Sequence, residues 1–336
     1  MAAHGSSPTP DPGILLRALS AYQLPMALKG AIELEVFTHI AAGANTPSVI
    51  APLCNASEKG VRVLCDYLTV NGFLVKRSGV YSLAPETGIF LDKKSPAYMG
   101  SVAGFLAHDM MRKNFSDVAA LVRNGGAVFH EMLGPDDPIW VEFARSMAPM
   151  MGVPAEILAM HVAGSNPLKV LDIAAGHGLF GIFVARQNPQ AQVTAVDWAN
   201  VLEVAQENAK KMGVADRYHA LPGSAFDVDL GSGFDLVLLP NFLHHFDEAT
   251  CVKLLQRLRA AMSPTGTLAT VEFVPNEDRV SPPHAAAFSM MMLGGTEAGD
   301  AYTFLELERM TQAAGFGATE LHSLAPAPQS LLLTRY

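Results

Sequence analysis

The segment Val170–Gly181, with the sequence VLDIAAGHGLFG, constrains the fold of this chain more than any other. Its first four residues read as a buried strand, and small residues with glycines then lead into a helical pattern. A turn without side-chain bulk lets a ligand approach the backbone, and the N-terminus of the next helix offers free N–H groups. The segment therefore predicts a strand–turn–helix unit that binds a ligand at the carboxyl end of its strand.

Two later segments predict what that ligand is. Asp197 closes a second apolar strand, where a carboxylate can accept hydrogen bonds from both hydroxyls of a ribose. His244 and His245 follow a third strand, at the edge where open α/β sheets hold their ligands. Together these residues predict a nucleoside-containing cofactor with a candidate base beside it.

A dinucleotide site is the alternative, because Gly176–Gly181 fits G-x-G-x-x-G and Asp197 follows about 20 residues later. Asp172 disfavours it, since its carboxylate would repel a pyrophosphate but could meet a cationic or hydrogen-bond-donating ligand tail. The unit also begins past residue 165, which leaves a single βαβ half. Finally, the chain ends in an expected antiparallel hairpin, 319–324 and 330–335, unlike a second dinucleotide half.

Composition narrows the class of protein. With 336 residues, two domains are expected. The net charge of -9 argues against nucleic acid or an anionic membrane as a main partner. The three cysteines have no metal-binding spacing, so no metal is expected and the thiols should be reduced, as in a cytoplasmic protein. No secretion signal and no apolar stretch of membrane-spanning length is evident.

The first hundred residues predict a winged-helix unit. Helical patterns over 13–40, 47–53 and 57–71 precede a hairpin over 73–83 that turns at Ser78-Gly79. The third helix carries few basic residues, so we expect it to mediate dimerisation. A DNA-binding regulator is the alternative.

The whole chain is expected to have three parts. We expect a winged-helix dimerisation domain over 13–100, a helical linker and substrate-pocket segment over 101–165, and a catalytic domain over 166–336. Strands and helices alternate from Leu168 onward, which predicts an α/β fold with a doubly wound parallel sheet and a C-terminal antiparallel hairpin. Methionines flank this domain and could form a pliable wall for a flat apolar substrate, or simply fill the core. The substrate candidates are Met147, Met151 and Met291.

With these features, the chain resembles class I S-adenosylmethionine-dependent methyltransferases. More narrowly, it is similar to the small-molecule O-methyltransferases typified by plant caffeic acid and isoflavone enzymes and by bacterial polyketide-tailoring enzymes. The segments that carry the resemblance are Glu33–Phe37, Tyr81–Pro85, Trp140–Met147 and Ala313–Phe316. The resemblance implies a Rossmann-like catalytic domain, a homodimer and a role in secondary metabolism.

The resemblance also implies how S-adenosylmethionine is bound. Gly176 and Gly178 would lie near its methionine part, Asp197 would bind its ribose, and Trp198 would cover its adenine. Ser224, Ala225 and Phe226 occupy the place of a Gly-Asp-x-Phe adenine contact, in which Ser224 replaces the aspartate. Ala174 stands where many relatives have the first glycine of the turn. The full predicted cofactor set is Asp172, Gly176, Gly178, Asp197, Trp198, Ser224, Ala225, Phe226 and Asn241.

For catalysis, the resemblance implies that His244 is the general base, and that Glu272 and Glu297 orient it. A histidine suits this role because its reference pKa of about 6.5 leaves the neutral form available near neutral pH. A short insertion follows Glu297, so Asp300 is a substitute for it, and His245 is read as secondary. The predicted reaction moves a methyl group to a phenolic or enolic hydroxyl of an apolar or aromatic small molecule.

Three alternatives stay open from the sequence. The same scaffold could methylate carbon or nitrogen. The glycine spacing by itself would also suit an NAD-dependent oxidoreductase, and the N-terminal unit would suit a ligand-binding regulator. The acids expected beside His244 favour oxygen, because a hydroxyl must lose its proton when it is methylated.

Overall fold

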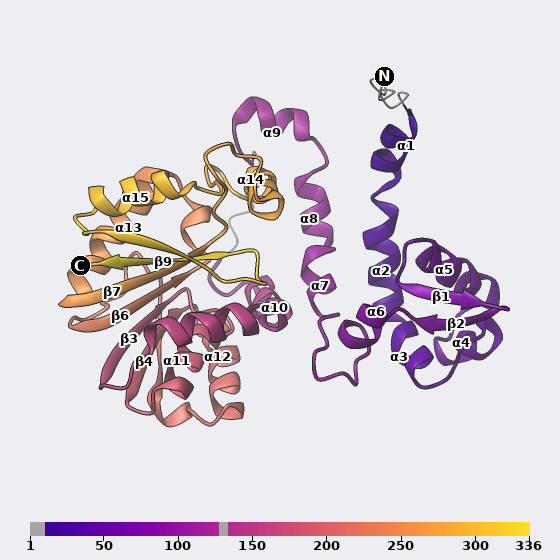
Figure 1. Ribbon diagram of the computed structural model, residues 1–336, viewed down its shortest axis with the longest axis horizontal. Helices are drawn as coiled ribbons and strands as arrows, with labels where there is room; N and C mark the ends of the chain where they lie inside the picture. Colours follow the sequence, from indigo (N-terminus) through magenta and orange to yellow (C-terminus); the bar gives the residue numbers. More distant parts are fainter. Residues whose placement is uncertain (1–10, 128–133) are drawn as a thin grey trace, which may run out of the picture. The chain divides into compact units, whose positions relative to one another are not determined.

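The computed structural model describes residues 11–127 and 134–336, and the chain divides after His108 into two compact units. We describe each unit by itself, because their relative positions are not determined (Figure 1). Among the described residues, no helix is long and apolar enough to cross a membrane.

The N-terminal unit is helical apart from one β-hairpin. Its elements are α1 (Gly13–Ser20), α2 (Gln23–Glu33), α3 (Val36–Ala41), α4 (Pro47–Leu53), α5 (Glu58–Val70), β1 (Leu74–Arg77), β2 (Val80–Leu83), α6 (Pro85–Phe90) and α7 (Val102–Leu106). Ser57 caps α5 by accepting a hydrogen bond from the Gly60 N–H. The helices and the hairpin enclose a small core in which Phe37, Leu68 and Tyr81 are buried.

The hairpin has the predicted position and turn. Leu74 pairs with Leu83, and the turn residues Ser78 and Gly79 both have positive φ angles, 49° and 81°. Two positive φ angles suit the right-handed twist of a tight hairpin. The single helical stretch expected over 13–40 is instead three helices, and Glu35, in the left-handed conformation with φ 54°, separates α2 from α3.

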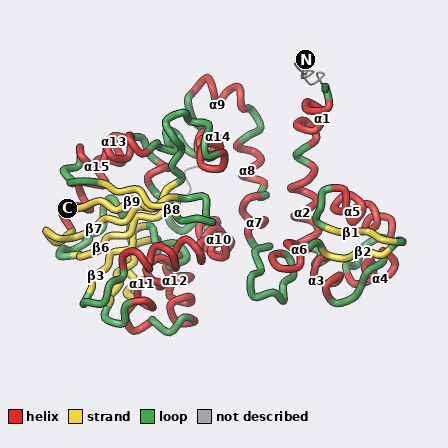
Figure 2. The backbone as a smooth tube through the Cα atoms, in the orientation of Figure 1, coloured by secondary structure: helices red, strands yellow, loops and turns green. Residues whose placement is uncertain are grey.

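The larger unit is built around a seven-stranded sheet (Figure 2). Its strands are β3 (Leu168–Ile173), β4 (Ala191–Asp197), β5 (Tyr218–Pro222), β6 (Phe234–Pro240), β7 (Met262–Glu272), β8 (Thr319–Ser323) and β9 (Ser330–Arg335). The strand order is β5-β4-β3-β6-β7-β9-β8, and β9 is antiparallel to both of its neighbours. The expected doubly wound sheet with a C-terminal antiparallel hairpin is confirmed.

Helices cover both faces of this sheet (Figure 1). They are α10 (Pro138–Val162), α11 (Leu179–Gln187) and α12 (Ala199–Lys211) on one face, and α13 (Glu248–Ala261) and α15 (Phe304–Ala313) on the other. Because strand side chains alternate between faces, Leu238 and Val271 pack toward the first group, and Val237 and Leu239 toward the second. The order reverses between β3 and β6, so the cofactor-binding edge predicted from the sequence lies there.

Three further helices were not resolved as separate elements from the sequence. They are α8 (Asp109–Asn114), α9 (Val118–Asn124) and α14 (Pro283–Gly295). A Cβ atom on Gly294 of α14 would lie 2.6 Å from the Phe115 ring, so the end of α14 packs closely on the segment that joins α8 to α9. Because α14 is apolar on all sides, its sequence has no amphipathic period that would identify it as a helix.

Candidate active site

The turn after β3 is the first part of the site. Ala174, Gly176 and Gly178 have φ angles of 50°, 57° and 76°, so three of five consecutive residues are left-handed. Glycine adopts such angles without strain, whereas alanine does so at a cost of about 1 kcal/mol or more. A Cβ atom on Gly176 would meet only the Ala174 carbonyl, at 3.8 Å, so the turn leaves this part of the backbone accessible.

Asp197, at the end of β4, is held against that turn. Its Oδ2 atom accepts a hydrogen bond from the Gly176 N–H at 2.8 Å, and its Oδ1 atom accepts one from the Trp198 N–H at 2.7 Å. Burial raises the pKa of this carboxyl, and the two backbone N–H groups oppose that rise. Each oxygen keeps a lone pair, so the fixed carboxylate can accept hydrogen bonds from a vicinal diol.

Asp172, at the end of β3, lies in the interior beneath the turn. Its side chain is fully buried, and its Oδ2 atom accepts a hydrogen bond from the Gly181 N–H at 3.0 Å. Burial raises its pKa well above the usual range, and the charge of Asp197 adds to the rise. Among the described residues, Oδ1 of Asp172 has no hydrogen-bond partner. Asp172 therefore supports the turn from below.

His177 stiffens the same turn. Its ring nitrogen Nδ1 accepts a hydrogen bond from the Leu179 N–H at 3.1 Å, and its carbonyl accepts one from the Asn208 amide. The side chain is 7% exposed, and burial lowers its pKa to about 4. The imidazole is therefore neutral at neutral pH, and the positive charge that it would carry in acid is disfavoured.

The two side chains predicted as base and orienting acid meet at the ends of β6 and β7. The Nδ1 atom of His244 lies 2.6 Å from Oε2 of Glu272, and both side chains are almost fully buried. The other carboxylate oxygen, Oε1, accepts backbone hydrogen bonds from Phe242 at 3.0 Å and from Leu243 at 2.8 Å. Since a carboxylate can only accept, Nδ1 carries the imidazole proton and Nε2 is free to take another.

Aromatic rings surround His244. The Phe288 ring of α14 contacts it edge-on, with centroids 4.9 Å apart, and stacks on Phe273 at 3.9 Å. The His245 ring lies 4.3 Å from that of His244. Although the His245 side chain is exposed, surrounding protein lowers its pKa well below the usual range, and His244 adds to the effect. His245 is therefore a neutral neighbour of His244.

The remaining two acids named from the sequence take different positions. Glu297 is exposed on the loop after α14. The carboxylate of Asp300 lies 3.3 Å from Arg279 and also accepts a hydrogen bond from the Ala301 N–H. The insertion that contains Asp300 packs on the His244 backbone, because a Cβ on Gly299 would lie 2.1 Å from the His244 carbonyl oxygen.

Three of the residues assigned to adenine, Ser224, Ala225 and Phe226, follow β5, whereas Trp198 follows β4. Phe226 packs edge-on against Phe246, with centroids 5.1 Å apart, and Ala225 is buried in the same cluster. The Ser224 hydroxyl accepts a hydrogen bond from the Phe226 N–H at 3.1 Å. Trp198, at the start of α12, packs on a small cluster with Trp140.

The methionines divide by depth. Met147 and Met291 are half-buried, whereas Met151 of α10 is only 6% exposed. The Met151 Sδ atom receives two side-chain amides, from Asn241 at 3.6 Å and from Gln329 at 3.9 Å. Sequence reasoning did not identify Gln329, Phe273 or Phe288, and no motif marks them.

Comparisons with known proteins agree with this geometry. A family model of the O-methyltransferase domain matches residues 108–317, and one of the O-methyltransferase dimerisation domain matches residues 16–93. The first match covers more than half of the chain. The chain therefore belongs to this family of S-adenosylmethionine-dependent O-methyltransferases, and the oxidoreductase and regulator alternatives are set aside.

Individual relatives match along nearly the whole chain. A 3-hydroxy-5-methyl-1-naphthoate 3-O-methyltransferase from Streptomyces sahachiroi is 28% identical, over 94% of this chain and 93% of the relative. The crystal structure of a putative O-methyltransferase from Nostoc punctiforme is 48% identical with a TM-score of 0.94, over 98% and 100% of the two chains. Human N-acetylserotonin methyltransferase in complex with S-adenosylmethionine has the same fold, at 22% identity and a TM-score of 0.85, over 99% of each chain.

The lowered pKa of His177 predicts acid sensitivity of the fold. An unfolded histidine titrates near about 6.5, whereas folded His177 titrates at about 4. Between these two pH values the unfolded histidine binds a proton and the folded one does not. The free energy of unfolding therefore falls as the pH drops from about 6.5 toward about 4, by up to about 1.4 kcal/mol per pH unit.

His177→Asn, which keeps a hydrogen-bond acceptor for the Leu179 N–H, should remove that part of the slope. The measurement is urea unfolding of both proteins between pH 4 and 7. Asp172 titrates in both proteins, so its opposite effect cancels in the difference. Equal slopes for the two proteins would contradict the assignment.

Proposed function

We propose that this enzyme transfers a methyl group from S-adenosylmethionine to a phenolic or enolic hydroxyl of an apolar small molecule, with His244 as the general base. The hydrogen bond between His244 and Glu272 is the observation that carries the proposal. A buried imidazole fixed at Nδ1 by a carboxylate has Nε2 available to accept a proton, as a hydroxyl nucleophile requires.

The residues at the ends of β3 and β4 fit the cofactor. Asp197 offers the ribose a carboxylate that two backbone N–H groups hold in place. The turn at Gly176 gives a ligand room beside the backbone. We propose that Gly178 completes the methionine side, that Trp198 and Phe226 flank the adenine with Ser224 and Ala225, and that Asp172 acts through the turn. The Asn241 amide, expected from the sequence to contact the cofactor, faces the Met151 sulfur, and we propose that it contacts the acceptor.

The chain's own residues would remove the acceptor's proton, orient the histidine that takes it and exclude water. Bound S-adenosylmethionine supplies an already activated methyl group, so the protein mainly needs to align the acceptor and remove its proton. The Nε2 atom of His244 takes the hydroxyl proton, and Glu272 holds the ring and stabilises the imidazolium that results. Phe288 and Phe273 exclude water from one side of that ring.

The acceptor class follows from the walls of the site and from a relative. Met147, Met151 and Met291, with the aromatic pair of Phe288 on α14 and Phe273 just after β7, suit a flat apolar molecule. The Streptomyces relative is named for a hydroxynaphthoate acceptor. We therefore propose a hydroxylated aromatic of similar size, formed in secondary metabolism. A cytoplasmic location also stays a proposal, supported by three cysteines that are all free thiols.

Removing the base should separate turnover from cofactor binding. His244→Ala should lower the turnover number about 10²–10⁴-fold, the usual contribution of a positioned base, with the affinity for S-adenosylhomocysteine unchanged. Glu272→Gln should lose less, because it orients the ring without moving the proton.

The control for this test is His219→Ala, at an exposed imidazole on β5. Steady-state rates with a naphthol acceptor and calorimetric titration are the measurements. If His244→Ala keeps the full rate at neutral pH, the base lies elsewhere and proximity alone accounts for the reaction.

Asp197 gives a test of the cofactor site. Asp197→Ala should weaken S-adenosylhomocysteine binding by about 1.5–3 kcal/mol, through loss of charge-assisted hydrogen bonds. Calorimetric titration with S-adenosylhomocysteine and with NAD checks this on one sample. Binding of NAD in place of S-adenosylhomocysteine would contradict the proposed site.

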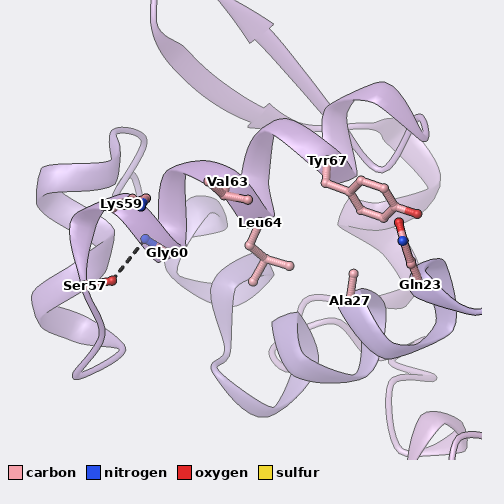
Figure 3. A pocket seen from close by; sticks show the side chains of 8 residues that line it. All are labelled: Gln23, Ala27, Ser57, Lys59, Gly60, Val63, Leu64 and Tyr67. Atoms are coloured by element: carbon pink, nitrogen blue, oxygen red, sulfur yellow. Dashed lines mark hydrogen bonds between the residues drawn. The ribbon is translucent and has the colours of Figure 1, made fainter.

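We also propose that the enzyme is a homodimer joined through its N-terminal units, as the matched dimerisation domain indicates. Helix α1 has no buried residue, and Ile14, Leu16 and Leu19 are each 65–76% exposed. A groove of about 510 Å³ lies between α2 and α5, lined by Ala27, Val63, Leu64 and Tyr67 among others (Figure 3). Apolar surfaces of this kind mark contacts with a second protein surface.

Charge placed in that groove should separate the subunits. Val63→Asp should give a monomer, because the side chain, half-exposed in one chain, would be desolvated in the dimer. Val280→Asp, at an exposed position in the larger unit, is the matched control. Sedimentation velocity checks both variants. A monomeric wild-type protein would rule out the dimer.

A further inference from the structure

Two side-chain amides from the sheet edge that carries the proposed catalytic base converge on one sulfur atom. The amide nitrogens of Asn241 and Gln329 lie 3.6 and 3.9 Å from the Met151 Sδ atom. Gln329 is 3% exposed and Met151 is 6% exposed. A thioether is a weak hydrogen-bond acceptor, so neither amide has a strong partner for these N–H groups.

The oxygens of the same amides are also unsatisfied. Among the described residues, Oδ1 of Asn241 and Oε1 of Gln329 are buried without a hydrogen-bond partner. Buried polar groups in folded proteins are nearly always hydrogen-bonded, so two unpaired amide oxygens need a physical explanation. Asn241 is in addition left-handed, with φ 52°, which is a second unfavourable feature at one residue.

These amides lie at the edge of the sheet that holds the base. Asn241 follows β6 directly, and its N–H donates to the Val271 carbonyl of β7 at 2.7 Å. Gln329 precedes Ser330, which pairs with Glu272 in the β7–β9 ladder. Gln329 is therefore the neighbour in sequence of Ser330, and Ser330 is the strand partner of Glu272, whose carboxylate holds His244.

Met151 has the properties of a side chain that can move aside. Methionine has three flexible side-chain bonds and adapts to different shapes. It lies on α10 between Pro149 and Pro154, and each proline removes one backbone hydrogen bond of the helix. If the Met151 side chain moves, the place of its sulfur is a position that two N–H donors already face.

We propose that Gln329, together with Asn241, is a specificity-determining residue that binds an sp² oxygen of the methyl acceptor, a carbonyl or carboxylate next to the hydroxyl that is methylated. The acceptor oxygen takes the place of the Met151 sulfur and accepts both N–H groups. This inference rests on the proposed function, and it narrows the acceptor from any apolar phenol to one that carries a second oxygen near the reacting hydroxyl.

The test compares three acceptors that differ at one substituent. 2-Naphthol has no second oxygen, 3-hydroxy-2-naphthoate has a carboxylate, and 3-hydroxy-2-naphthamide has a neutral carbonyl. Each is titrated calorimetrically into the full-length enzyme saturated with S-adenosylhomocysteine. We expect the wild-type enzyme to bind the naphthamide or the naphthoate about 10-fold more tightly than 2-naphthol, as two modest hydrogen bonds would give. Tighter binding of the naphthamide would indicate that the amides bind a neutral carbonyl oxygen, and tighter binding of the naphthoate a charged carboxylate oxygen.

Gln329→Met removes the amide and keeps the length of the side chain. It should abolish the preference and leave 2-naphthol and S-adenosylhomocysteine affinities unchanged. Gln329→Glu, which keeps the shape and replaces the donor by an acceptor, should reverse it. Gln312→Met, at an exposed position of α15, is the matched control. The melting temperature of each variant verifies that it is folded.

The outcomes separate this inference from the function on which it rests. Wild-type enzyme that binds 2-naphthol as tightly as the other two compounds overturns the inference and leaves phenol methylation standing. Weakened S-adenosylhomocysteine binding by Gln329→Met, with the acceptor preference intact, would assign the amides to the cofactor and also overturn it. If none of the three naphthols binds, the phenolic acceptor class itself fails, and the inference fails with it.

Discussion

The carboxylate of Glu272 is the contact on which the geometry of the candidate site depends. One oxygen holds the His244 imidazole, and the other accepts the first N–H groups of the turn that carries this histidine. The turn and the His244 ring are therefore fixed by one side chain at the end of a central strand. Such sharing restricts both the backbone position and the ring orientation of His244, and a base must be placed to within about 0.5 Å to be effective.

The turn after β3 is likewise held in place by a carboxylate from a neighbouring strand. Its left-handed residues bring backbone N–H groups to the sheet edge, and Asp197 reaches back to hold Gly176. Ala174 adopts a left-handed angle without the freedom of glycine, so the surrounding contacts must compensate for this strain. Buried Asp172 and His177 lie beneath and within the turn and supply part of that support.

The sequence predicted the parts of the molecule that depend on local pattern. The β-hairpin at Ser78-Gly79, the alternating strands and helices and the antiparallel C-terminal strands were all expected and are present. Helix α14 was missed because its residues are apolar all round, so period and burial give no signal. The meeting of His244 with Glu272 could be anticipated from their strand ends, although their roles remain predictions.

Contacts that join distant segments could not be predicted in the same way. The insertion after Glu297 brings Gly299 onto the His244 backbone and directs Asp300 toward Arg279, and neither result follows from spacing. Gln329 is an ordinary residue between proline and serine, and only the pairing of β9 with β7 places it next to Ser330, the strand partner of Glu272. Specificity arises from such long-range neighbours, whereas the shared chemistry is marked by local motifs.

The charges of the site form one consistent pattern. Burial raises the pKa of Asp172 and Asp197 and lowers that of His177. The protein around the exposed His245, with His244, lowers the pKa of His245, so each of these environments favours a neutral side chain. Two backbone N–H groups oppose the effect at Asp197, and one opposes it at Asp172. A carboxylate at Asp197 would be useful for binding hydroxyls. A site with few charges suits an apolar acceptor, because little water must be held or displaced. It also leaves His244, held by Glu272, as the imidazole of the site with a carboxylate to stabilise its protonated form. Under the proposed mechanism, proton removal would therefore fall to the Nε2 atom of His244.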